Sequence, residues 1–157
     1  MPRYSVSASA TMNAQPHVVW DIIADYRVGH PMILPKGFSA IQVERGGIGA
    51  GTVIHFSVRT MGVAREFHQV VSTPEPGRVL VESSTTDSAI TTFTIAAVDE
   101  GSHSRVEIAT EMDGRPGLPG ALERAMTRLV MGRMYREELS KLASFAEARS
   151  VEGRRAE

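Results

Sequence analysis

Two side chains that can exchange protons, Tyr26 and His30, lie close together in a segment rich in proline and glycine. A histidine titrates near neutral pH, and a phenol can donate a proton or a hydrogen bond, so the pair could perform acid–base chemistry at the mouth of a pocket. Met32 follows in the same segment and would add an adaptable apolar wall. The alternative interpretation is that these side chains only pack the loop.

Two arginines suggest a different chemistry, the binding of an anionic group. If residues 61–62 form a two-residue hairpin turn, Arg65 shares one sheet face with Phe56 and Phe67. An arginine inside a protein needs a partner or an anionic ligand, because an unpaired buried charge is costly. Arg133 could likewise anchor a carboxylate. The alternatives are that Arg65 reaches solvent at the open end of the sheet, and that Arg133 forms a salt bridge to the sheet.

The same hairpin would place His55 beside His68 on the opposite face, with Glu66 nearby. Two imidazoles and a carboxylate are ligand types that suit zinc. This face of a curved sheet normally contacts water, where such pairs arise by chance, so we predict no metal site. The chain contains no cysteine, which excludes disulfides, thiolate catalysis and cysteine metal sites.

A glycine-rich segment, residues 46–51, superficially resembles a dinucleotide-binding loop. That motif must open a helix whose N-terminus holds the pyrophosphate. Residues 52–58 instead alternate between apolar and polar, which predicts a strand. We therefore interpret residues 46–51 as a turn between two strands and predict no cofactor.

The composition is that of a soluble globular protein: 157 residues, 42% hydrophobic and 22% charged. The net charge of -1 argues against nucleic-acid binding driven by bulk electrostatics. No run approaches the roughly 18 apolar residues that a membrane span requires, and the N-terminus lacks the apolar segment of a signal peptide. We expect a cytoplasmic protein with no nucleic-acid partner.

Alternating apolar and polar residues predict seven strands. The connections between successive strands are too short for a parallel crossover, so the strands are expected to pair antiparallel. The chain therefore belongs to the α+β class. The expected strands are Tyr4–Thr11, Phe38–Glu44, Thr52–Thr60, Val63–Thr73, Arg78–Ser84, Ala89–Val98 and Ser104–Met112.

Helical patterns lie at both ends of the chain. After the first strand, Asn13 is expected to cap a helix that carries Pro16 in its first turn and ends near Asp25. Residues 26–37 contain several prolines and glycines and predict a loop with at most short helical turns. We expect residues 1–149 to form one domain and residues 150–157 a disordered tail.

A long helix is predicted from about Leu118 to Ala146, and its apolar stripe swings by about a quarter turn near Gly132. Two halves of one helix thus face different surroundings. We expect the first half to roof a cavity and the second half to pack on the sheet. The two faces consist of Leu122, Ala125, Met126, Leu129 and Val130, and of Tyr135, Leu139, Leu142, Ala143 and Ala146.

The order of these patterns resembles the START/Bet v 1-like (SRPBCC) superfamily, in particular its bacterial polyketide cyclase/dehydrase and lipid-transport branch. The resemblance covers about residues 3–146. It is carried by several short motifs whose order and spacing are together specific for the fold. The motifs lie at Ala14–Asp25, Gly49–Val53, Glu75–Glu82, Thr91–Ile95, Gly101–Val106 and Leu139–Leu142.

The resemblance implies a helix-grip fold, in which a seven-stranded curved antiparallel sheet, two short helices and a long C-terminal helix enclose an apolar pocket. Members of this superfamily bind lipids, sterols or quinones, assist the cyclisation of aromatic polyketides, or act as hydrolases or interaction modules. They share no universal catalytic set, so the resemblance assigns no catalytic residue here.

We therefore predict a binding protein for a small apolar or amphipathic molecule, such as a lipid, isoprenoid, quinone or polyketide-like aromatic. The alternatives are a polyketide cyclase/dehydratase-like enzyme that uses Tyr26, His30 or Arg65, and a protein-interaction module; a homodimer also stays open. Glu82 and Thr92 are further candidates for polar pocket groups. The predicted ligand-binding residues are Tyr26, His30, Met32, Phe56, Arg65, Phe67, Phe93, Met126, Leu129 and Arg133.

Overall fold

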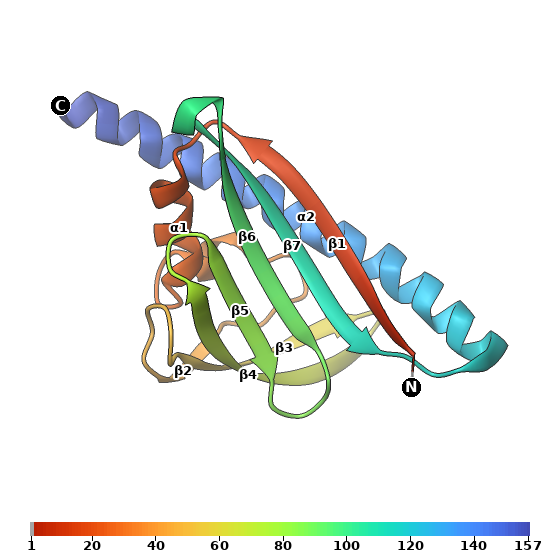
Figure 1. Cartoon of the computed structure of the whole chain (residues 1–157). Helices are drawn as coiled ribbons and strands as arrows, with labels where there is room; N and C mark the ends of the chain where they lie inside the picture. Colours follow the sequence, from red (N-terminus) through yellow and green to blue (C-terminus); the bar gives the residue numbers. More distant parts are fainter. Residues whose placement is uncertain (1) are drawn as a thin grey trace.

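The computed structural model describes residues 2–157, which form a curved antiparallel sheet with a long helix crossing one of its faces (Figure 1). We call the face toward this helix the inner face. The helix-grip fold predicted from the sequence is confirmed, and its seven strands follow the order β1-β7-β6-β5-β4-β3-β2. The elements are β1 (Arg3–Met12), α1 (Pro16–Ala24), η1 (His30–Ile33), β2 (Gln42–Arg45), β3 (Val53–Thr60), β4 (Val63–Glu75), β5 (Val79–Ser84), β6 (Ile90–Val98), η2 (Asp99–Gly101), β7 (His103–Asp113) and α2 (Gly117–Ala156).

The β3–β4 hairpin has the predicted register. Met61 and Gly62 both have positive φ angles, 52° and 79°, as a type I′ turn requires. His55 consequently pairs with His68, and Phe56 with Phe67. The strand expected from Phe38 is shorter than predicted, because β2 begins only at Gln42 and Phe38 makes an isolated bridge to β3.

Helix α1 begins with Pro16, as expected, but the predicted cap is wrong. Gln15 occupies the N-cap position and its side chain makes no capping hydrogen bond. The backbone N–H of Asn13 instead donates to a carboxylate oxygen of Glu147, 3.1 Å away on α2. This contact ties the segment before α1 to α2.

The glycine-rich segment 46–51 is a turn, as predicted, and it also fixes the end of α1. The N–H of Tyr26 donates to the carbonyl of Gly47 at 2.8 Å, and the N–H of Gly49 donates to the carbonyl of Ala24 at 2.9 Å. Gly47 has a φ angle of 135°, and a Cβ atom there would lie 2.3 Å from the Arg27 side chain. This turn therefore holds the segment that carries Tyr26 and His30 in place.

Helix α2 extends to Ala156, beyond the end near Ala146 that the apolar stripe predicted. The segment after Ala146 has no proline and consists mostly of good helix formers such as Glu152 and Arg154, which let an exposed helix continue. None of the helices within residues 2–157 combines the length and apolar character that crossing a bilayer requires.

The apolar core lies between the inner face of the sheet, α1 and the C-terminal half of α2. The prediction that this half of the helix packs on the sheet is confirmed, since Leu139 and Leu142 are fully buried. They meet core side chains of the sheet such as Leu80, Ile95 and Ile108. Hydrophobic burial at this end accounts for the attachment of α2 to the sheet.

Gly29, just before η1, tests how tightly the loop packs on α1. A Cβ atom there would lie 2.6 Å from the carbonyl oxygen of Ile22 and 2.9 Å from its Cα. We expect Gly29→Ala to lower the free energy of unfolding by about 1–3 kcal/mol, since backbone must shift to admit the methyl group. Thermal and urea unfolding would measure this.

The matched control is Gly153→Ala, because a Cβ atom at this exposed helix position would meet no other atom within 4 Å. The control should leave stability unchanged or raise it by up to about 1 kcal/mol. Equal effects of the two substitutions would contradict the packing described for Gly29.

Candidate functional site

Three polar residues cross the inner face of the sheet in one row. Glu82 on β5 pairs with Thr91 on β6, and Thr91 pairs with Thr110 on β7. All three side chains are buried, although the inner-face residues on either side of them along these strands are largely apolar. Buried polar groups are costly unless they are hydrogen-bonded, so this row needs partners from elsewhere in the chain.

Those partners come from the loop after α1 and from α2. The Tyr26 hydroxyl donates to Oε1 of Glu82 at 2.6 Å. The Thr91 and Thr110 hydroxyls lie 2.7 Å apart, and Thr110 is in turn hydrogen-bonded to the hydroxyl of Tyr135. We call this buried set the polar band; it consists of Tyr26, His30, Glu82, Thr91, Thr110, Tyr135 and Glu138.

His30 lies at the centre of the acidic part of the polar band. Its Nδ1 is 2.7 Å from the carbonyl oxygen of Ile23, and because a carbonyl only accepts, Nδ1 carries a proton. Its Nε2 therefore faces two carboxyl groups, at 3.7 Å from Glu82 and 3.8 Å from Glu138. The ring stacks on Tyr26 with centroids 4.4 Å apart. An imidazole between two carboxyl groups, stacked on a phenol, is a proton-exchanging arrangement.

Burial changes the acidity of the groups around His30. Burial, and then the charge of Glu82, raises the pKa of Glu138 well above its usual value. Burial and the same carboxylate raise the pKa of Tyr26 as well. Burial also raises the pKa of Tyr135. These directions favour a protonated Glu138 and neutral phenols in the interior.

The polar band separates a solid core from a looser region. On the side of α1, the inner-face residues next along the strands, Leu80 and Phe93, are fully buried. On the side of the β3–β4 hairpin lies a stack of three aromatic rings, Phe38, Phe56 and Phe67, with centroids 5.6 Å and 5.4 Å apart. Phe56 is buried, but Phe38 and Phe67 are only partly covered.

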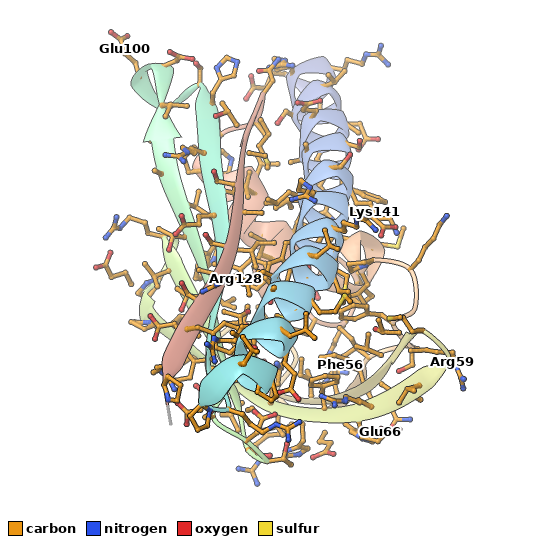
Figure 2. All side chains as sticks on the ribbon, turned by 90° about the vertical axis from the view of Figure 1, so that its right-hand side faces the viewer. Phe56, Arg59, Glu66, Glu100, Arg128 and Lys141 are labelled. Carbon is orange, nitrogen blue, oxygen red and sulfur yellow. The ribbon has the colours of Figure 1, made fainter. Side chains whose placement is uncertain are left out.

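The N-terminal half of α2 does not close over this looser region as a roof. Leu122, Met126 and Leu129 are 71%, 50% and 49% exposed. The prediction that this half of α2 roofs a cavity is therefore wrong. Of its methionines and leucines, only Met131 and Met134 pack against the core. In Figure 2, Phe56 lies between β3 and α2, whereas Arg59 lies at the end of the hairpin and Glu66 on the side away from α2. Between hairpin and helix, the side chains of Phe67 and Met134 are only partly covered.

One buried group in this region lacks a partner. Gln69 lies on the inner face of β4, between Phe67 and Val71 along the strand, and only 7% of it is exposed. Among the described residues, its Oε1 atom makes no hydrogen bond. An unpaired buried oxygen costs about 1–3 kcal/mol, so its retention requires an explanation.

The structure brings together only part of the predicted site. Tyr26, His30 and Phe93 meet at the polar band, where the ring of His30 lies 5.6 Å from that of Phe93. Phe56 and Phe67 form the aromatic stack, and Met126 and Leu129 lie half-exposed on α2. The remaining predicted site residues are exposed and lie away from the band: Met32, Arg65 and Arg133.

Arg65 is exposed, in agreement with the alternative that it reaches solvent at the open end of the sheet.

Glu82 faces inward, and on β6 the inward threonine is Thr91 rather than Thr92. Glu138, Thr110 and Tyr135 were not predicted. An available signal was the neighbouring polar pair Thr91-Thr92 in a largely apolar strand, since strand alternation turns one of two adjacent residues inward.

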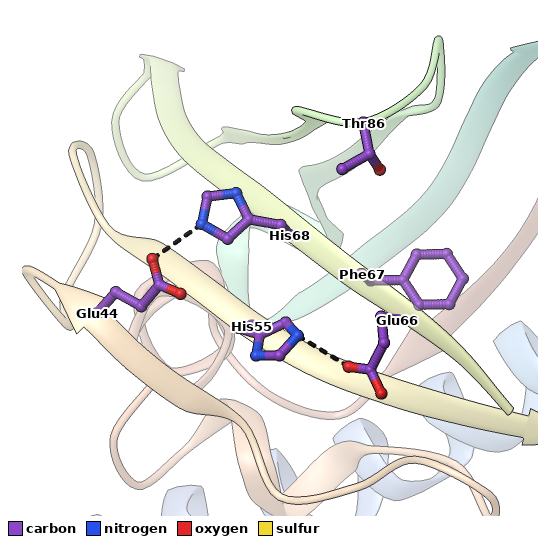
Figure 3. Close-up of a pocket in the computed structure, with 6 residues that line it drawn as sticks. All are labelled: Glu44, His55, Glu66, Phe67, His68 and Thr86. Atoms are coloured by element: carbon purple, nitrogen blue, oxygen red, sulfur yellow. Dashed lines mark hydrogen bonds and ion pairs between the residues drawn. The ribbon is translucent and has the colours of Figure 1, made fainter.

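The outer face carries the predicted histidine pair in a shallow pocket (Figure 3). His55 pairs with Glu66 at 2.8 Å, and His68 is bonded to Glu44 at 2.8 Å and to Thr85 at 2.7 Å. Both ring nitrogens of His68 are thus occupied by protein partners. Nowhere in residues 2–157 do three histidine, aspartate or glutamate side chains gather in a way that could hold a metal ion.

Comparison with known proteins gives a family match and many similar structures. The family model described as "Polyketide cyclase / dehydrase and lipid transport" matches residues 3–147. The solution structure of KanY protein is 29% identical, covers 94% of this chain and 99% of its own, and superimposes with a TM-score of 0.81. A search of curated proteins found no significant match.

Two more distant structures share the fold. The Zhui aromatase/cyclase from Streptomyces sp. R1128 is 16% identical, with 94% of this chain and 96% of that chain covered and a TM-score of 0.74. A protein from Thermus thermophilus is 20% identical, with 94% and 99% covered and a TM-score of 0.75.

The raised pKa of Glu138 predicts a pH dependence of stability. Above the usual value of 4.5 the unfolded chain releases this proton while the folded protein keeps it, so the contribution is complete below that pH and is lost as the pH rises through the folded pKa. Glu138→Gln mimics the protonated form. We expect its stability advantage over the wild type to grow with pH, by about 1.4 kcal/mol per pH unit within the window.

Urea unfolding at pH 5, 6, 7 and 8 would measure the difference. Glu152→Gln, a substitution at an exposed position of the same helix, is the control and should show a difference independent of pH. If Glu138→Gln were equally destabilising at every pH, Glu138 would be ionised in the folded protein and the assignment would be wrong.

Proposed function

This chain belongs to the polyketide cyclase/dehydrase and lipid transport family, and on that basis we propose that it binds a small apolar or amphipathic molecule between the sheet and α2. The ligand would lie in the partly covered region between the β3–β4 hairpin and the N-terminal half of α2. Its apolar body would contact the aromatic stack, and its polar end would point toward the polar band.

The observation that carries this proposal is the change in burial across the polar band. On one side the inner face is fully packed, whereas on the other the large apolar side chains Phe67 and Met134 are only partly covered. Ligand sites in proteins combine such apolar walls with a few polar groups that fix orientation. Met126, Met131 and Met134 on the facing helix supply unbranched side chains that adapt to different shapes.

A second function, polyketide cyclase/dehydratase-like catalysis, is favoured by the position of His30 between Glu82 and Glu138. Such a group could remove a proton from an acidic carbon and return it to a developing oxygen anion. We rank this function second because His30 is 2% exposed, so a substrate could reach it only if the surrounding side chains moved.

Phe67 provides a direct test of binding. The neutral dye N-phenyl-1-naphthylamine fluoresces in apolar surroundings, and we expect it to bind the wild type. Phe67→Ala removes a stacked ring from the wall, so the dye should bind about 10-fold more weakly, in line with the 1.5–3 kcal/mol gained on burying a large apolar side chain. Fluorescence titration would measure the affinity.

The control is Val151→Ala, which removes an apolar group from the distant C-terminal turns of α2 and should leave dye affinity unchanged. Wild-type protein that binds no dye would contradict the proposal. Equal weakening by both substitutions would show that the dye contacts the surface at random.

His30→Gln separates binding from catalysis. A protein that only binds should retain dye affinity within about twofold, because the dye has no need of an acid–base group. A cyclase would lose turnover of a poly-β-ketone thioester by a factor of about 100 or more, the contribution typical of general acid–base catalysis. Ultraviolet absorbance of an aromatic product would report turnover, and wild-type protein that forms no such product would exclude this second function.

A further inference from the structure

The polar groups around the candidate site differ in kind from those expected at a site for an anion. Tyr26 donates to Glu82, and Nδ1 of His30 donates to the carbonyl of Ile23, so these hydrogens are already used. What remains toward the interior is mostly acceptor oxygen: the carboxyl groups of Glu82 and Glu138, of which a protonated Glu138 also holds one O–H, and the Gln69 amide, whose Oε1 has no partner. Oxygens of this kind recognise a group that donates a hydrogen bond.

Gln69 is the clearest of these oxygens. Val71 pairs with Glu82 across β4 and β5, so Gln69, two residues along β4 on the same face, is a diagonal neighbour of Glu82. Such diagonal neighbours lie about 7–8 Å apart, within reach of one polar group that bonds to both. Gln69 thus presents an unpaired acceptor at the edge of the polar band, on the side of the aromatic stack.

The net charge of Glu82, Glu138 and His30 also argues against an anionic ligand. While Glu82 is ionised, the summed charge of Glu82, Glu138 and His30 is zero if the other two are protonated, and negative otherwise. The buried residues of segment 2–157 include no lysine or arginine. A buried carboxylate without a cationic partner is strongly disfavoured. Arg65 shares the inner face with Phe67 but is exposed, so an anionic group held at the polar band would lose its hydration and gain no ion pair there.

The cation that acts on Glu138 is already engaged. Lys141 acts on Glu138, but its Nζ donates to the carbonyl of Leu34 at 2.7 Å and lies 3.7 Å from Glu137. The two arginines predicted to bind an anion, Arg65 and Arg133, are exposed. None of these three side chains belongs to the buried polar band.

We propose that the site takes a neutral molecule whose polar group donates a hydrogen bond, an alcohol or a phenol, and rejects a carboxylate of the same shape. The donor would bond to Gln69 and the edge of the polar band, while the apolar body lies against Phe56 and Phe67. This inference rests on the proposed binding function and narrows its ligand class.

Three probes of one ring system test it: naphthalene, 2-naphthol and 2-naphthoate, titrated at pH 7 and followed by calorimetry. A phenol is neutral and a carboxylate ionised at this pH. We expect 2-naphthol to bind at least about 10-fold more tightly than 2-naphthoate, because only the carboxylate buries an unpaired charge. It should also bind more tightly than naphthalene, by the one added hydrogen bond.

Gln69→Met keeps an unbranched side chain and removes the acceptor. It should weaken 2-naphthol binding about 2- to 10-fold, the worth of one hydrogen bond, and leave naphthalene binding unchanged. It should also raise the stability of the ligand-free protein, because a buried unpaired oxygen is lost. Gln42→Met, the same change at an exposed position on β2, should alter none of these quantities.

The outcomes separate the two proposals. If 2-naphthoate binds as tightly as 2-naphthol, the inference about ligand class fails while the binding function stands. If none of the three probes binds, the proposed function fails and the inference fails with it. If Gln69→Met weakens naphthalene and 2-naphthol equally, Gln69 shapes the wall and does not accept a hydrogen bond from the ligand.

Discussion

The burial of ionisable groups is the constraint on which the interior of this protein depends. Glu82, Glu138 and His30 are all at least nine-tenths buried, and none could stay there alone. Each faces a partner from a different segment: a phenol, an imidazole or a backbone carbonyl. The polar band therefore exists only when the loop after α1, the sheet and α2 are assembled together. The candidate site thus depends on contacts between all three parts of the fold.

This requirement explains two features that apolar packing alone would leave without a reason. The glycine-rich turn at 46–51 is bonded to the end of α1, which fixes the backbone from which Tyr26 and His30 project. Helix α2 passes over the band with Tyr135 and Glu138 on its buried face, among leucines that anchor it. The turn and the helix both hold polar side chains within hydrogen-bonding distance of one another.

Much of the fold could be predicted because it follows from local rules. Alternation and short connections predicted every strand and the antiparallel sheet, and a two-residue turn fixed the register of His55 with His68. The interior polar residues were harder to predict. Glu138 stands three residues after Tyr135 and four before Leu142, on the stripe predicted to pack on the sheet, and this spacing was an available signal of its burial. The exposure of Met126 and Leu129 could not be predicted, because an apolar stripe on a helix does not show whether another element covers it.

The unequal anchoring of α2 has a consequence for how this protein can change over evolutionary time. Its C-terminal half is held by fully buried residues such as Leu142, where almost any replacement disturbs the core. The half beginning at Gly117 carries apolar side chains that contribute little to stability, because they are largely uncovered. Mutations in that half can accumulate without unfolding the domain. The shape of the opening is thus free to diverge between descendants of one ancestor while the scaffold beneath it stays the same.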